Sequence, residues 1–577
     1  MAERRLCRTS PFSSGTLPEF ILHCVFEHID MPEDRGAVSL VCREWYYVER
    51  WTRRKLTITC CYAISPSRLT QRFPALQELK IKGKPRASMF GLVPDDWGGY
   101  AGPWISEISV NCKCLYALHL RRMVVIDEDL STLAEERGDM LQILRLDRCS
   151  GFSTTGLQVI TKSCRNLRQF SVEESYVREI NGDWLKELYR HNTALQSLNI
   201  SGTNLKHVCL DDLSSLAANS KSLVSLKLNE LELGDLSETL RGTTALEELG
   251  GVCIDLRMDM ELRDNINLPN TLTSLVALFY AGVGQGDDII NSIVQPIAPR
   301  LRRLDLQLSC LTVEGHCRLL MHCANLQALE VFDDVGDDGL HIIAQTCRNL
   351  RRLRVQRGDK ELQQGFITQR GLISIAFNCH MLECIAACVS NINNAALSTI
   401  AFNCPNLRDF RLVLVDEANE DSEYPLDDGI RDLIIARPKL RRLALCVLEG
   451  FLTDQGMKEI GIYGKNLEWV LLGLTGDSDE GIKLFANGCS SLKKLEIRDC
   501  VFSEAAITAS VLNMAALKYV WVEGYRNTDT GRDLLPLTQN FWRVELINKP
   551  NGPAQFFAYR SLAEKRTDLR SSVRILG

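Results

Sequence analysis

"CRNLRRLRV", residues 347–355, decides the fold, because its pattern Cys-x-x-Leu-x-x-Leu-x-Val recurs along the chain. Close copies begin at residue 164 ("CRNLRQFSV"), 323 ("CANLQALEV"), 404 ("CPNLRDFRL") and 489 ("CSSLKKLEI"). Weaker copies such as "FPALQELKI" fill the intervals, so anchoring leucines recur from Leu76 to Leu517, mostly 23 to 29 residues apart, with helical patterns between them. This period predicts an α/β fold, a leucine-rich-repeat solenoid of about 18 strand-helix units, shaped as a horseshoe or ring.

The repeats are predicted to occupy residues 56–560, after a flexible N-terminus at 1–11 and a helical segment at 12–55, and before a C-terminal tail or cap at 561–577. Phe541 is a candidate start for one further repeat. Three anchor spacings are longer than the rest, and the extra residues follow the strand each time. They predict long loops near 83–105, 357–370 and 415–429 on one rim, where irregular loops are commonly functional.

Composition excludes several classes of function. Seven of the 22 cysteines, among them Cys164, Cys347 and Cys489, occupy one slot of the repeat, which favours small buried hydrophobes over disulfides or metal ligands. The formal net charge of −6 does not favour direct nucleic-acid binding. No apolar run reaches the roughly 18 residues of a membrane span, and the first residues lack the apolar segment of a signal peptide. Without a nucleophile triad, a phosphate-binding glycine loop or a metal-ligand spacing, we expect a soluble, intracellular binding protein and not an enzyme.

Basic side chains gather at positions that face the hollow of the solenoid. In each Leu-x-Leu strand the residues between and beside the leucines point into the hollow. Several of these are cationic: Lys80, Lys82, His119, Arg121, Arg122, Arg352, Arg354, Arg411, Arg442, Lys494 and Arg498. Such crowding predicts a cavity for an anion, since guanidinium groups suit carboxylate and phosphate. The alternatives are a solvated face, or neutralisation by Glu78, Asp409 or Glu496.

The loop "KIKGKPRASMF", residues 80–90, adds an apolar edge to that cavity. Lys82, Lys84 and Arg86 would form one wall, and Met89 and Phe90 an apolar lip above it. Trp521, in "YVWVEG", is also predicted to face the hollow. Cations below aromatic side chains fit an amphipathic carboxylic acid.

Residues 12–55 resemble an F-box, on the evidence of Leu17-Pro18, Ser39-Leu40-Val41-Cys42 and Trp45. The resemblance implies that Leu17, Pro18, Leu40, Val41 and Trp45 bind a Skp-type adaptor, which links the chain to the cullin scaffold of a ubiquitin ligase.

Along nearly its whole length the chain also resembles the coronatine-insensitive jasmonate receptors. The sister auxin receptors of the transport-inhibitor-response type share "VCREWY", "KGKP", "WGGY" and "RRMVV". "PRASMF", "RLRVQRG", "DFRLVLVD" and the C-terminal "FFAYRSLAEKRTDLRSSVRIL" favour the jasmonate branch. The resemblance implies a non-catalytic subunit that captures the degron of a JAZ-type repressor, with a small oxylipin acid as the bridge, so that the repressor is ubiquitinated and degraded. It implies a nuclear location, with the cytoplasm as a second possible site.

The same resemblance assigns residues to three partners. For the oxylipin acid, Arg86, Arg354 and Arg411 hold the carboxylate and amide, Arg498 reaches toward the ring, and the wall comprises Ala87, Phe90, Leu92, Ala386, Val413, Leu471 and Trp521. For an inositol polyphosphate below the acid, the residues are Lys82, Arg86, Arg122, Arg352, Arg411 and Lys494. For the degron, they are Met89 and Phe90.

Two positions depart from the family pattern, because Cys388 and Cys446 stand where those receptors carry tyrosines beside the ligand ring. Loss of each hydroxyl donor would remove a neutral hydrogen bond to the ligand, at a cost of about 0.5–1.5 kcal/mol. We therefore expect a bulkier or longer oxylipin acid than the isoleucine conjugate, such as a dinor precursor. Three rival functions stay open at this point: an auxin receptor, an F-box protein that binds its target without a small ligand, and a repeat scaffold without a ligase.

Overall fold

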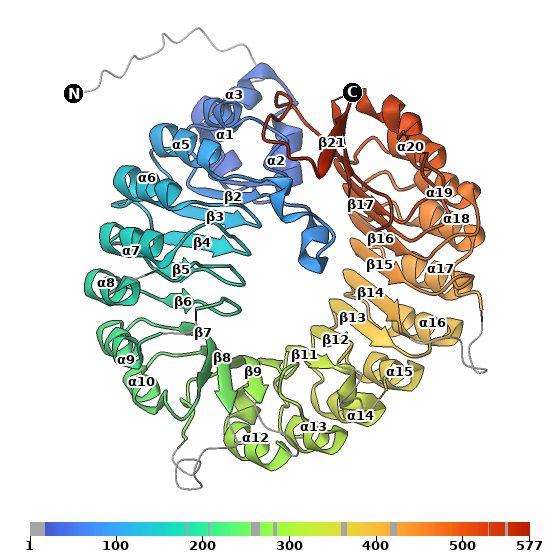
Figure 1. The fold of residues 1–577 in the computed structure, drawn as a ribbon. Helices are drawn as coiled ribbons and strands as arrows, with labels where there is room; N and C mark the ends of the chain where they lie inside the picture. Colours follow the sequence, from blue (N-terminus) through green and yellow to red (C-terminus); the bar gives the residue numbers. More distant parts are fainter. Residues whose placement is uncertain are drawn as a thin grey trace.

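The computed structural model describes residues 18–180, 183–205, 208–254, 266–280, 286–358, 366–415, 424–528, 530–539, 541–548 and 552–577. In this part of the chain the strands line the inside of a nearly closed ring and the helices cover its outside (Figure 1). The ring confirms the predicted solenoid. Leu17, the N-terminus at 1–11 and parts of the loops at 357–370 and 415–429 lie outside the described residues. None of the described helices is long and apolar enough to cross a membrane.

Parallel strands β1 to β18 form the inner wall, each paired with the next. They are β1 (Lys55–Ile58), β2 (Glu78–Lys82), β3 (Ala117–Arg121), β4 (Ile143–Asp147), β5 (Gln169–Ser171), β6 (Ser197–Asn199), β7 (Ser225–Glu232), β8 (Glu248–Ile254), β9 (Ser274–Tyr280), β10 (Arg303–Asp305), β11 (Ala328–Phe332), β12 (Arg352–Gln356), β13 (Cys384–Val389), β14 (Asp409–Leu414), β15 (Arg442–Cys446), β16 (Trp469–Gly473), β17 (Lys494–Arg498) and β18 (Tyr519–Glu523). All but β1 follow an anchoring leucine. β1 lacks the motif and pairs with β2, with Lys55 opposite Glu78.

The outer layer of the ring consists of one helix in most repeats. These helices are α4 (Pro66–Arg72), α5 (Gly102–Asn111), α6 (Asp127–Arg137), α7 (Thr154–Ser163), α8 (Trp184–His191), α9 (Leu210–Asn219), α10 (Ser237–Gly242), α12 (Asp287–Val294), α13 (Val313–Leu320), α14 (Gly336–Thr346), α15 (Gln369–Asn378), α16 (Asn394–Asn403), α17 (Asp427–Ala436), α18 (Asp454–Tyr463), α19 (Asp479–Ala486) and α20 (Glu504–Asn513). Short 3-10 turns are η1 (Arg86–Phe90), η2 (Asp95–Trp97), η3 (Ala298–Arg300), η4 (Asp333–Val335) and η6 (Arg532–Thr538).

Two recurring contacts hold neighbouring repeats together. The slot cysteines are buried and unbridged, and the Cys347 thiol donates to the carbonyl of Cys323 one repeat earlier. This confirms their prediction as small core residues. An aspartate in the first turn of one helix accepts hydrogen bonds from the N-cap residue of the next, as Asp427 does from the amide of Thr453 at 3.0 Å and from its hydroxyl at 2.5 Å.

The C-terminal residues cap the last repeat with antiparallel strands. β20 (Gln555–Arg560) pairs with β18 on one side and β19 (Trp542–Ile547) on the other, and β19 pairs with β21 (Val573–Leu576). Phe541 therefore precedes an antiparallel strand and does not start a further parallel repeat. The cap covers the open edge of β18, which a parallel repeat would have left unpaired.

The cap also closes the ring onto the loop that follows β2 (Figure 1). The Arg566 guanidinium, whose side chain is 2% exposed, pairs with Glu545 at 3.2 Å and with Asp568 at 2.8 Å, and donates to the carbonyl of Trp97. Trp97 Nε1 donates to Glu545 at 2.8 Å, and the Tyr62 hydroxyl donates to Asp568. The loop that carries η1 is thus fixed to the C-terminus by a buried polar network.

The predicted F-box consists of α1 (Glu19–Glu27), α2 (Pro32–Val38) and α3 (Arg43–Thr52). Leu22, Phe26 and Val48 form its core, with Trp45 edge-on to Phe26 at 5.3 Å between ring centroids. The buried Glu49 joins this module to the repeats through an ion pair with Arg72 of α4 at 2.8 Å.

Candidate ligand cavity and adaptor surface

Side chains of β12 to β18 form three rows across the hollow of the ring, because the strands pair in register and alternate residues face inward. We call these rows lower, middle and upper, in order from the start of each strand. The lower row is Arg352, Cys384, Asp409, Arg442, Trp469, Lys494 and Tyr519. The middle row is Arg354, Ala386, Arg411, Ala444, Leu471, Glu496 and Trp521. The upper row is Cys388, Val413, Cys446, Gly473, Arg498 and Glu523.

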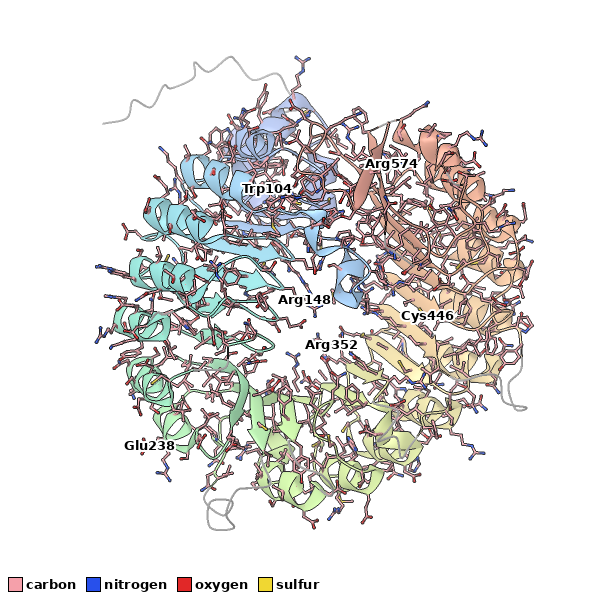
Figure 2. The ribbon with its side chains drawn as sticks, viewed as in Figure 1. Trp104, Arg148, Glu238, Arg352, Cys446 and Arg574 are labelled. Carbon is pink, nitrogen blue, oxygen red and sulfur yellow. The ribbon has the colours of Figure 1, made fainter. Side chains whose placement is uncertain are left out.

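A cavity of about 670 Å³ lies between these rows, the η1 turn and the turns after β3 and β4. Figure 2 shows Arg148, Arg352 and Cys446 on the inner side of the ring and Glu238 on its outer side. Of the predicted residues, those that line the cavity are Lys82, Arg86, Met89, Phe90, Arg122, Arg354, Ala386, Cys388, Arg411, Val413 and Lys494. The repeat therefore brings together residues that are up to about four hundred positions apart in the sequence.

The cavity carries an excess of positive charge. Nine cationic side chains line it: Lys82, Arg86, Arg121, Arg122, Arg148, Arg354, Arg411, Arg442 and Lys494. Glu174 and Glu496 line it as well, while Asp409 pairs with Arg411 at 2.7 Å and Glu330 with Arg354 at 2.9 Å. Among the described residues, four acidic side chains therefore stand against nine basic ones at this cavity. Within this part of the chain, acidic neighbours pair with individual arginines but are outnumbered by the basic side chains.

The protonation of several lining residues reflects this crowding. Burial, followed by repulsion from Lys494, lowers the pKa of Lys82 to about 7. Burial, with further repulsion from Arg121, lowers the pKa of Arg122 to about 10, and burial also lowers the pKa of Lys494. A bound anion would relieve both causes by replacing lost hydration and by screening the cations. Buried cations crowded in this way make the cavity a candidate anion site.

Trp469 lies at the centre of the arginine cluster. The guanidinium carbons of Arg86, Arg411 and Arg442 lie 4.8, 5.3 and 5.6 Å from its ring centroid, and its Nε1 donates to Glu496 at 3.0 Å. The Tyr519 hydroxyl accepts a hydrogen bond from the Arg86 amide at 3.2 Å. Neither aromatic residue was predicted as part of the site from the sequence. The signal was present, since each stands two residues after an anchoring leucine, as Arg352 and Lys494 do.

Seven predicted ligand residues do not line this cavity. Arg498 stacks on Phe90 at 4.7 Å in the upper row, whereas Arg352 is exposed at the start of β12. Leu471 and Cys446 pack in a small apolar cluster with Trp469. Ala87, Leu92 and Trp521 pack in a separate cluster with Trp97 and Phe557.

The expectation that Trp521 faces the hollow is not met, although its register is the one predicted. Trp521 is fully buried, because Phe557 of β20 lies directly opposite it and Ala87 of η1 packs in the same cluster. The apolar lip is present as predicted: Phe90 is 51% exposed, and Met89 beside it is partly exposed.

The F-box presents an exposed apolar surface. Leu40 is 85% exposed and Val41 60%, at the turn between α2 and α3. Phe20 and Tyr47 are exposed as well. Trp45 instead packs inside the module. An apolar patch of this kind on a small helical domain marks a protein interface.

Two family models match the N-terminal part of the chain. Residues 14–55 match the F-box family, and residues 74–120 match the transport inhibitor response 1 protein domain. The chain is 43% identical to the rice coronatine-insensitive protein homolog 1a (Oryza sativa subsp. japonica), covering 98% of this chain and 97% of that protein. It is 42% identical to coronatine-insensitive protein 1 of Arabidopsis thaliana, covering 96% of each.

The chain belongs to the coronatine-insensitive family. A rice transport inhibitor response 1-like protein is less similar, at 33% identity over 92% of each chain, which places this protein on the coronatine-insensitive side of the two related groups. Its F-box and repeats make it a substrate-receptor subunit of an SCF-type ubiquitin ligase. In that role it binds and positions a target, and it does not itself transfer ubiquitin.

Proposed function

We propose that this coronatine-insensitive family member is an oxylipin co-receptor: a jasmonate-type carboxylic acid in the cavity completes a surface for the degron of a JAZ-type repressor. The observation that supports the proposal most strongly is the layering of the cavity. Its lower part is cationic, and its upper row is apolar apart from Arg498 and Glu523. Its middle row alternates arginines with alanines from Arg354 to Ala444 and then continues with Leu471, Glu496 and Trp521. An amphipathic acid matches this order of environments.

The floor of the cavity fits an inositol polyphosphate. Lys82, Arg122 and Lys494 line it together, and burial, followed by repulsion between cations, lowers the pKa of all three, so a nearby negative charge would favour their protonated forms. A polyanion at the floor would supply that charge and leave the middle row for a single carboxylate. In this arrangement Arg86 and Arg411, which stack on the same indole, serve both layers.

The oxylipin carboxylate would bind between Arg354 and Arg411 of the middle row. Both guanidinium groups are already oriented by acidic partners, so the ligand competes with those partners for hydrogen bonds. Arg498 supports a second polar contact: in the part of the chain that the structure describes, its buried Nε and Nη2 have no acceptor within hydrogen-bond distance, and Nη2 lies 3.6 Å from Glu496 Oε2. A ligand oxygen that accepts from them would remove the cost of unpaired buried donors.

Cys388 and Cys446 flank Val413 in the upper row, and we propose that they select a bulkier oxylipin than the isoleucine conjugate. Two thiols in place of two phenols enlarge this layer and remove two strong donors. Burial raises the pKa of both thiols, that of Cys446 to about 11, so they stay neutral and weakly polar.

The decisive experiment is a pull-down of a JAZ degron peptide by the full-length chain, with the isoleucine conjugate, a dinor cyclopentenone acid or an indole acid added separately. We expect recovery with the cyclopentenone acid and little with the other two. Restoring tyrosine with C388Y/C446Y should shift the preference toward the isoleucine conjugate. Strong, selective recovery with the isoleucine conjugate by the unmodified chain would refute the ligand assignment, and recovery with the indole acid alone would favour an auxin receptor.

Two arginine variants separate ligand-dependent capture from direct capture. Arg354→Ala and Arg411→Ala should each lower degron recovery at least tenfold, because each removes a charge-assisted contact of about 1.5–3 kcal/mol. Arg408→Ala is the matched control, since it removes an exposed guanidinium next to β14 and outside the cavity. Unchanged recovery by both cavity variants would support an F-box protein that binds its target without a ligand. We place this activity in the nucleus, where a fluorescent fusion should accumulate.

A further inference from the structure

Among the described residues that line the cavity, Glu496 is the buried acidic residue, and its negative charge opposes anion binding. Its side chain is 1% exposed, whereas the other lining carboxylate, Glu174, is 46% exposed. Glu496 shares the inward face of β17 with Lys494 and Arg498, one on each side of it. The nearest guanidinium nitrogen of Arg86 is 3.9 Å from its Oε1, and that of Arg498 is 3.6 Å from its Oε2.

These contacts connect three separate parts of the site. Arg86 belongs to η1, Trp469 to β16 and Arg498 to β17. The indole N–H of Trp469 donates to Glu496 Oε1 at 3.0 Å, which fixes the ring on which the arginines stack. The Arg498 guanidinium lies over Phe90, the exposed residue of the lip. Glu496 thus interacts with Trp469, Arg86 and Arg498, and it is connected to the lip through Arg498.

We propose that Glu496 is an internal counter-ion that holds Arg86, Trp469 and Arg498 in place and restricts the middle row to a ligand with a single negative charge. The proposal rests on the proposed function and names a residue that sets its selectivity. A carboxylate buried among cations holds them together in the absence of a ligand. Its charge also repels each further anion, and at this burial the repulsion is stronger than it would be for a carboxylate in water. A polyphosphate is therefore confined to the floor, while one carboxylate is tolerated above it.

A positioning residue and an electrostatic gate predict opposite outcomes for Glu496→Gln. The amide oxygen of glutamine can still accept from Trp469 Nε1, so the variant removes the charge and keeps that hydrogen bond. If Glu496 acted only as structural support, loss of its ion pairs would weaken anion binding. As a gate it repels polyanions, so the variant should bind inositol hexakisphosphate more tightly, by about tenfold or more at low ionic strength.

The test compares the full-length wild type, Glu496→Gln and Glu174→Gln by isothermal titration with inositol hexakisphosphate. Glu174→Gln is the matched control, because it removes the same charge from the same cavity at a half-exposed position. We expect it to tighten binding by about twofold at most, given solvent screening. Equal or weaker binding by Glu496→Gln than by the wild type would overturn the proposal, as would equal gains in the two variants.

Thermal unfolding without any polyphosphate provides a second readout. The cations around residue 496 lose their counter-ion in Glu496→Gln, so its midpoint should fall below the wild-type value at about 20 mM NaCl and recover toward it at about 500 mM, where screening is stronger. Glu174→Gln should show no such salt-dependent deficit. A midpoint equal to the wild type at low salt would overturn the counter-ion role. If no variant binds the hexakisphosphate, the polyphosphate floor of the proposed function fails, and the unfolding result alone decides the role of Glu496.

Discussion

Substitution of Arg566 should break the buried polar network that closes the ring, and the resulting loss of stability can be estimated from the structure. Arg566→Met removes the guanidinium that pairs with Glu545 and leaves a carboxylate that is fully buried. Among the described residues, two neutral donors then remain for Glu545: Trp97 Nε1 at 2.8 Å and the Tyr559 hydroxyl at 2.9 Å. Loss of one partner from a buried pair destabilises by about 3–5 kcal/mol.

We call the contact between residues 86–97 and the C-terminal cap the seam of the ring. The destabilisation should appear first as local opening at this seam, because residues 86–97 reach the cap through the Trp97 contacts. At about 1.4 kcal/mol per tenfold, 3 kcal/mol corresponds to an open population about 100-fold larger. Hydrogen exchange followed by mass spectrometry should show that increase in a peptide covering 86–97, with exchange at α13 unchanged. Arg86 belongs to this segment, so the affinity for inositol hexakisphosphate should fall as well.

The stability defect of Arg566→Met should depend on pH. Burial already raises the pKa of Glu545, and Arg566 opposes that shift. Without Arg566 the folded-state pKa rises further above the unfolded value, so the folded state binds more protons in that window and stability falls as pH rises through it. The defect of Arg566→Met should therefore be smaller at pH 5.5 than at pH 8. The double variant R566M/E545Q should recover most of the loss at pH 8, since it buries no charge. A single variant as stable as the wild type, or a double variant no better than the single, would refute the reasoning.

Three further predictions concern the cavity and the F-box. The pKa of Lys82 is about 7 in the free protein, so polyphosphate binding above pH 7 must take up a proton there; affinity should fall as pH rises from 7 to 8.5, and Lys82→Met should flatten that slope in calorimetric titrations. Trp469→Leu removes the ring beneath Arg86 and should weaken polyphosphate binding about tenfold, from cation–π contacts of about 0.5–2 kcal/mol each; an affinity within twofold of wild type would contradict its central place. Leu40→Asp with Val41→Asp should abolish copurification of a Skp-type adaptor and leave polyphosphate affinity unchanged, so retained adaptor would exclude this surface.

The fold was largely predictable because each leucine anchor fixes its own strand, and register then follows from the two-residue period. Two elements could not be predicted in this way. β1 pairs with β2 although "KLTI" carries no anchor, since the edge of the first repeat needs a partner. The antiparallel cap follows from the same need at the other edge, and its residues, from Trp542 onward, show no repeat.

The candidate site was predictable to the extent that it follows from register. The inward positions of β12, β14 and β17 supplied Arg354, Arg411 and Lys494, and all three line one cavity. The same rule applied to aromatic residues would have supplied Trp469. Burial of Trp521 was not predictable, because it results from contact between β18, β20 and η1, which lie far apart in the sequence.

The seam also explains why the anion cavity lies at this place in the ring. η1 is the element that contacts both ends: its Arg86 amide donates to Tyr519 of β18, and its loop is bound to the cap through Trp97. The F-box is joined to the same first repeats through the buried pair of Glu49 with Arg72. A continuous path of buried polar contacts and paired strands therefore runs from the adaptor surface to the lip at Phe90. A receptor that must present a bound target to a ligase at a fixed distance needs such a path, because a flexible connection would let the target adopt many orientations.

The position of the ligand at the seam has a further consequence. A bound anion that draws Arg86 toward β14 and β16 would also tighten the closure of the ring, so we expect ligand affinity and the rigidity of the presenting surface to rise together.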